Sequence, residues 1–190
     1  PNLTELGGFK SCKQLEEVKL ADNCALKTIV SQAFMDCTNL KSFDFNYLPN
    51  LELINDNAFK ECSSLKKFDF TNCPKLKSIG KSCFNNCSSI EIADLSNCSD
   101  MTTISSGSFN NCTSLSIFRF PKGNKYKGTT DARILLNCPA LKLVDMTGCA
   151  GVTRIRDTFS NMPSLETVIF DGADAFTGRY VDGMFKNDYN

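Results

Sequence analysis

Cysteine is the residue type with the widest chemical scope in this chain, because eleven of the 190 residues are cysteine and none is histidine. Thiols can form disulfides, bind zinc or act as nucleophiles. The closest pair, Cys83 and Cys87, supplies too few ligands for zinc, and without histidine no Ser-His or Cys-His pair can form. No glycine motif for phosphate or dinucleotide binding is present. We therefore expect a protein that is not an enzyme, with no metal site and no cofactor.

Most of the cysteines recur at a fixed step along the chain. A residue that recurs once per repeat is a packing position, and free cysteine is small, apolar and readily buried. Neighbours in such a column would lie about 5 Å apart with their Cβ atoms pointing the same way, which is poor disulfide geometry. We expect mostly reduced, interior thiols, with a disulfide framework as the alternative. The first column is Cys12, Cys37, Cys62, Cys87, Cys112 and Cys138, and the second includes Cys73, Cys98 and Cys149.

The elements that position these cysteines repeat with the same step. Phe9, Phe34, Phe59, Phe84 and Phe109 fall 25 residues apart. Each copy has an L-x-x-φ-x-φ segment, where φ is apolar, and this alternation is typical of a short strand. One copy cannot bury its apolar side alone, whereas stacked copies can, as in a leucine-rich repeat.

The fold class that follows is an α/β leucine-rich-repeat solenoid of right-handed turns. We expect a parallel sheet of short strands on one face, with short helical turns or loops on the other. Polar residues before Ala-Phe, as in SQAFMDC at 31–37, favour one helical turn with its Phe and Cys inward. The position three residues after each strand, occupied by Asn23, Leu48 and Cys73 in successive copies, is expected to bond the turns as an incomplete ladder.

The repeats predict a single domain at 1–190 of about seven copies of 25 residues, within a longer protein. The irregular copy spans 121–135 and contains Gly123, Gly128 and a cluster of lysines. This segment is interpreted as a solvated loop, or alternatively as a contact loop for an acidic partner.

The block A-F-x-x-C-x-x-L-x-x-F-x-F at 33–45 and 58–70 resembles the BspA-like class of leucine-rich repeats. The stretch after the strand departs from that class, which often has L-P-x-x-L-x-x-I-G there. The resemblance implies a secreted or cell-surface adhesion module that binds a host or matrix protein, or another surface protein. The L-x-x-C element is also similar to repeats of ubiquitin-ligase receptors, which makes an intracellular adaptor the alternative.

Charge and hydropathy exclude two other classes of partner. The chain has 21 basic and 21 acidic residues, whereas a nucleic-acid-binding protein carries a basic excess. No apolar run approaches the roughly 20 residues of a membrane span. We therefore expect no nucleic-acid partner and no membrane insertion in this segment.

The outward positions of the strands are the candidate protein-binding site. Three aspartates in one column would repel one another, and Arg119 could pair with either of its neighbours, Asp94 and Asp145. Exposed apolar residues beside charges indicate a contact site. A covering loop, association between chains through this face, or Ca²⁺ bound by the aspartates are the alternatives. The candidate residues are Asp44, Asp69, Ile92, Asp94, Ile117, Arg119, Leu143 and Asp145.

Overall fold

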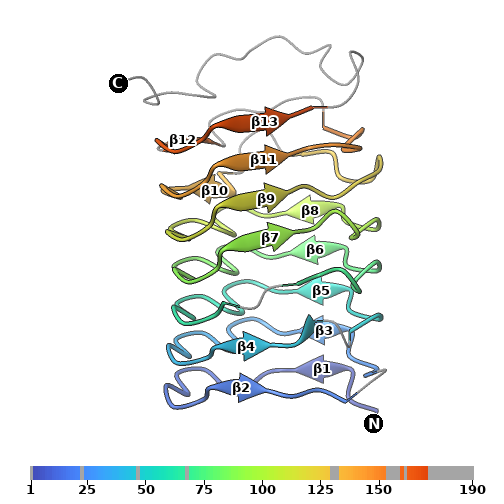
Figure 1. Ribbon diagram of the computed structural model, residues 1–190. Helices are drawn as coiled ribbons and strands as arrows, with labels where there is room; N and C mark the ends of the chain where they lie inside the picture. The colour runs from blue at the N-terminus through green and yellow to red at the C-terminus, as the bar shows by residue number, and fades with distance from the viewer. Residues whose placement is uncertain are drawn as a thin grey trace.

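The computed structural model winds the chain into a solenoid in which each repeat makes one turn (Figure 1). Successive turns stack along one axis, and like positions of neighbouring repeats lie next to each other. This arrangement confirms the leucine-rich-repeat solenoid predicted from the 25-residue period. The structure describes residues 2–21, 24–45, 48–66, 69–128, 133–152, 159–160 and 162–170.

The strands are short and pair only in parallel with the strand one turn away. One sheet has the order β1-β3-β5-β6-β8, a second has β13-β11-β9-β7, and two further pairs are β2-β4 and β10-β12. The first sheet consists of β1 (Glu5–Leu6), β3 (Thr28–Ile29), β5 (Leu53–Ile54), β6 (Ser78–Ile79) and β8 (Thr103–Ile104). The others are β2 (Glu17–Val18), β4 (Ser42–Phe43), β7 (Ile92–Asp94), β9 (Ile117–Arg119), β10 (Leu135–Leu136), β11 (Leu143–Asp145), β12 (Phe159–Ser160) and β13 (Thr167–Ile169).

The structure contains a set of strands that the sequence did not predict. The predicted L-x-x-φ-x-φ segments form β2, β4, β7, β9, β11 and β13, and the L-x-x-I segments form the sheet β1-β3-β5-β6-β8 behind them (Figure 1). In this sheet of L-x-x-I segments, Ile29 pairs with Ile54, and Ile54 pairs with Ile79. Each isoleucine points inward and is almost fully buried, because side chains alternate between the two faces of a strand.

The phenylalanines of the 25-residue period form the centre of the core. Rings one turn apart, from Phe9 through Phe34, Phe59 and Phe84 to Phe109, have centroids 5.1 to 5.3 Å apart and interplanar angles of 0° to 19°. This separation is close to the roughly 4.8 Å between paired strands. The column of stacked rings therefore follows directly from the constant rise of the backbone per turn.

The F-x-x-C segments are extended turns, and none of the described residues forms the helical turn that we expected. In the segments around Phe34, Phe59, Phe84 and Phe109, two positions have the left-handed conformation, which interrupts a right-handed helix. Their N–H groups bond to the next turn instead, as Ser82 does to the carbonyl of Ser106 at 3.0 Å. The left-handed residues are Gln32, Asn57, Ser82 and Gly107 at one position, and Ser11, Asp36, Glu61, Asn86, Asn111 and Asn137 at the other.

The cysteine column is an interior ladder of thiols, as predicted. From Cys37 to Cys138, each thiol of the column donates a hydrogen bond to the phenylalanine carbonyl of the preceding turn, for example Cys62 to Phe34 at 3.1 Å and Cys87 to Phe59 at 3.0 Å. All eleven cysteines are free, and every one except Cys12 is buried. Burial raises the pKa of the Cys87 thiol well above its ordinary value, so this group stays protonated.

The second ladder and the irregular repeat keep the core continuous. The thiol of Cys73 donates to the carbonyl of Phe45 at 3.4 Å, whereas Leu48 is buried without a polar side chain to offer, as expected for an incomplete ladder. Asn23 lies outside the described residues. In the irregular repeat, the buried Tyr126 takes the place of leucine and packs against Phe120, with the two ring centroids 5.9 Å apart.

Candidate protein-binding face

The outward side of β7, β9 and β11 carries a strip of three apolar residues, called the apolar strip below. Ile117 pairs in register with Ile92 on one side and with Leu143 on the other. Ile92 is 42% exposed, while Ile117 and Leu143 are half-buried by their neighbours. The next residues along the strands, such as Ala93 and Phe118, point inward and are fully buried. The structure therefore brings together the three apolar residues predicted for the site.

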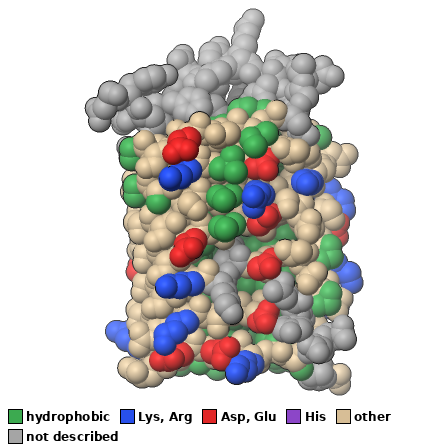
Figure 2. Space-filling view, in the orientation of Figure 1, with side chains coloured by type: hydrophobic (Ala, Val, Ile, Leu, Met, Phe, Trp, Pro, Cys, Tyr) green, Lys and Arg blue, Asp and Glu red, His purple; other side chains and the backbone are tan. Residues whose placement is uncertain are grey.

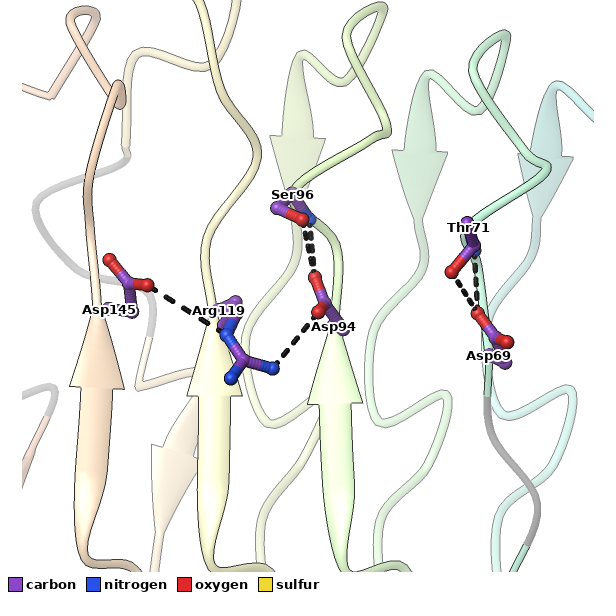
Figure 3. Close-up of polar contacts among 6 residues, drawn as sticks. All are labelled: Asp69, Thr71, Asp94, Ser96, Arg119 and Asp145. Atoms are coloured by element: carbon purple, nitrogen blue, oxygen red, sulfur yellow. Dashed lines mark hydrogen bonds and ion pairs between the residues drawn. The ribbon is translucent and has the colours of Figure 1, made fainter.

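Charged side chains flank the apolar strip (Figure 2). On one side, Lys142 lies 3.8 Å from Glu166. On the other side, Nη1 of Arg119 lies 3.0 Å from Asp94 and its Nε lies 3.8 Å from Asp145 (Figure 3). The predicted pairing of Arg119 is confirmed, and the arginine contacts both aspartates, which offsets the repulsion between them.

The aspartates also hold the turns that follow the strands, a role that the sequence analysis missed. Oδ1 of Asp69 accepts a hydrogen bond from the backbone N–H of Thr71 at 2.8 Å, and Asp94 does the same with Ser96 at 3.0 Å (Figure 3). Asp145 accepts from the N–H two residues later at 2.9 Å. The signal for these turns is the pattern D-x-(S/T), which recurs at the strand ends and is typical of Asx turns.

The Asp94 carboxylate is stabilised in its charged form. Partial burial raises its pKa, but hydrogen bonds from the hydroxyl and amide of Ser96, together with the charge of Arg119, lower it more. The net pKa lies below the ordinary value for aspartate. Asp94 therefore remains ionised at neutral pH and keeps its pairing with Arg119.

Asp44 and Asp69 lie apart from the apolar strip. They precede Asp94 by two repeats and one repeat in the same column. At the outward position beside Asp44, β4 carries the polar residue Ser42. Among the described residues, the apolar and charged parts of the candidate site therefore meet on β7, β9 and β11.

A hollow of about 190 Å³ opens at the ends of these three strands. Its walls come from the ends of β7, β9 and β11 and from the turns that follow them. Of its lining residues, Asp94, Arg119 and Asp145 were predicted as site residues, whereas Ser96, Phe120, Lys122 and Thr147 were not. Lys122 belongs to the basic segment of the irregular repeat, and this cluster of lysines was the sequence feature that could have indicated it as a site residue.

Neither a metal cluster nor a membrane-spanning helix occurs in the described ranges. There, no three Cys, Asp or Glu side chains lie close enough together to hold a metal ion. No helix in the same part of the chain has the length and apolar character needed to cross a membrane.

Comparison with known proteins identifies similar repeats. The family model for the BspA type leucine-rich repeat region, with six copies, matches residues 5–141 and 99–181. No curated protein matches the chain.

Solved bacterial leucine-rich repeat structures share the fold. The T. pallidum leucine-rich repeat protein TpLRR is 23% identical to this chain with a TM-score of 0.62, and the match covers 86% of this chain and 72% of TpLRR. A leucine-rich repeat protein from Bacteroides ovatus is 18% identical with a TM-score of 0.61, and the match covers 92% of this chain and 48% of its own.

Proposed function

Because the chain belongs to the BspA type leucine-rich repeat family, we propose that it is a non-catalytic scaffold that binds a protein ligand. The ligand contacts the outward face of β7, β9 and β11. The scaffold acts at the cell surface or after secretion, and its ligand is a host or matrix protein or another surface protein. Repeat solenoids commonly bind partners on such a continuous strand-lined face.

The observation that carries this proposal is the apolar strip. Ile92, Ile117 and Leu143 lie side by side on adjacent strands and point away from the core. Each Å² of apolar surface that a partner removes from water stabilises the complex by about 25 cal/mol. The strip is also rigid, because each strand is hydrogen-bonded within the stack, so binding orders little of the scaffold. A contiguous apolar patch with a charged rim is typical of a contact site.

The charged column beside the strip supplies selectivity in this proposal. Arg119, Asp94 and Asp145 are partly exposed, so their ion pairs remain accessible to a ligand. Charged groups around an apolar centre discriminate between partners and orient them more than they add to affinity. Asp44 and Asp69 extend this column beyond the strip, where they repel a ligand that carries negative charge.

An intracellular adaptor is the second candidate function, and the free thiols favour it. Disulfides are rare in reducing compartments, and all eleven cysteines are free. Burial protects every thiol except Cys12, however, so an oxidising environment is compatible with the same structure. Labelling of intact cells with a membrane-impermeant biotin reagent distinguishes the two: labelled protein supports the surface proposal, and label found only after lysis supports the adaptor.

Binding to an array of purified host, matrix and surface proteins tests the proposed face. We expect Ile117→Asp to weaken any specific binding at least about tenfold, because a charge then lies in the centre of the apolar strip. Leu53→Asp is the matched control, since Leu53 is 36% exposed at an outward position of β5 in the other sheet. Circular dichroism checks that both variants fold. Equal binding by the wild type and Ile117→Asp contradicts the proposal.

A further inference from the structure

The hollow at the ends of β7, β9 and β11 contains carboxylates whose oxygens are already engaged. Oδ1 of Asp94 accepts two hydrogen bonds from Ser96, and its Oδ2 accepts from Arg119 at 3.0 Å. Oδ1 of Asp145 accepts from Thr147 N–H, and its Oδ2 lies 3.8 Å from Arg119. These acceptors serve the scaffold, so they offer little to a cationic group on a ligand.

The same hollow retains hydrogen-bond donors with no partner among the described residues. Lys122 is exposed, and within the described part of the chain it forms no ion pair and the Thr147 hydroxyl forms no hydrogen bond. Arg119 has five N–H groups and directs only part of its guanidinium toward the two aspartates. The residues that line the hollow therefore include an ammonium, a hydroxyl and a guanidinium with unused N–H groups, a set of donors that suits an anion.

We infer that this hollow receives the carboxylate of an aspartate or glutamate side chain of the protein ligand, next to apolar side chains that cover the apolar strip. This inference rests on the proposed function and specifies the chemistry of its partner. Arg119 lies two residues after Ile117 in β9, a separation of about 7 Å along a strand. An extended ligand segment places an apolar and an acidic side chain at the same separation when they are two positions apart.

The basic segment after β9 reinforces this preference. Lys122 lines the hollow, and Lys127 follows in the same exposed loop, whereas Lys125 is held by Asp100 at 2.5 Å. Opposite charges increase the rate of association and favour one partner over another. An acidic ligand therefore binds at the end of the face near Lys122 and does not cover Asp44 and Asp69, which lie at the other end of the column.

A peptide selection tests the inference. A displayed library of random ten-residue peptides is selected on the intact chain, and peptides that also bind Ile117→Asp are discarded. We expect the remaining peptides to be enriched in an acidic residue two positions from an apolar one. A synthetic peptide from this set should lose about tenfold in affinity when its acidic residue is replaced by the amide.

Variants of the chain supply matched controls. Lys122→Glu should lower the affinity for the peptide at least about tenfold. Lys127→Glu makes the same charge change in the same loop but outside the hollow, and it should change the affinity by no more than about twofold. Thr147→Val removes the hydroxyl and keeps the N–H that bonds Asp145.

Peptides that depend on Ile117 but are rich in lysine or arginine, or are unaffected by Lys122→Glu, overturn this inference and leave the proposed face intact. A selection that yields no Ile117-dependent peptide counts against the face itself.

Discussion

Replacement of Phe59 by alanine tests the stacked phenylalanine column most directly. The Phe59 ring is fully buried, and it lies between the parallel rings of Phe34 at 5.2 Å and Phe84 at 5.3 Å. The ring of Phe43 contacts it at 5.1 Å in an edge-on arrangement. Phe59→Ala therefore removes ring contacts on several sides and leaves a cavity in the middle of the solenoid.

The expected cost follows from this environment. Phenylalanine-to-alanine changes in well-packed cores cost about 3 to 5 kcal/mol, and the loss of favourable aromatic contacts places Phe59 in the upper part of that range. We therefore expect the free energy of unfolding to fall by about 4 kcal/mol. Phe9 is the matched position, because it is half-buried at the first turn and stacks on Phe34 alone among the described rings. For Phe9→Ala we expect about 1 to 2 kcal/mol.

Urea unfolding followed by circular dichroism measures both variants. The midpoint should move to lower urea concentration for Phe59→Ala, and by less for Phe9→Ala. Because a repeat protein is held together by contacts between neighbouring turns, a weakened centre can also split the transition into two steps. Equal losses for Phe9→Ala and Phe59→Ala would refute the reasoning, since the two rings would then occupy equivalent environments.

Two further predictions concern the turns and the thiols. Ser82 has a φ of 51°, so Ser82→Gly should stabilise the fold by about 1 kcal/mol. Gly107 occupies the same position of the next repeat with a φ of 71°, so Gly107→Ala should destabilise the fold by about the same amount. The midpoint of urea unfolding measures both changes. Shifts in the opposite directions count against the left-handed turns. A thiol reagent should label only Cys12 in the native protein, and the other cysteines only after unfolding. Burial raises the pKa of Cys73 and Cys138 to about 12, so the unfolded chain loses these protons first and stability should fall as pH rises above about 9. Full labelling without denaturant, or stability that stays constant from pH 8 to 11, contradicts the interior ladder.

The candidate site was only partly predictable from the columns. Outward positions follow from the alternation of a strand, so Ile92, Ile117 and Leu143 could be placed on one face in advance. The sequence predicted that Arg119 could pair with either Asp94 or Asp145, and in the structure it contacts both. The hollow could not be foreseen, because its walls come from turns of three repeats whose path depends on side-chain hydrogen bonds such as those of Asp94.

The turns illustrate the limit of local reasoning most clearly. A polar residue followed by Ala-Phe favours a helical turn, yet the backbone at Asn57 and Glu61 has positive φ and bonds outward to the next repeat. The bond from the N–H of Asn57 to the carbonyl of Lys81, at 2.9 Å, replaces the bond that a helix would form within one repeat. Contacts between turns therefore override the local preference for a helix.

By itself, the sequence determined the stack: a constant 25-residue step brings identical side chains together, so the phenylalanine and cysteine columns are set by period alone. The tertiary structure alone decided that the L-x-x-I segments form a sheet of their own, that the F-x-x-C segments avoid helix, and that Lys122 and Thr147 line the same hollow. The physical reason is that period fixes which residues are neighbours along the axis. The path of the chain within each turn depends on hydrogen bonds to the turns on either side, which no single repeat specifies.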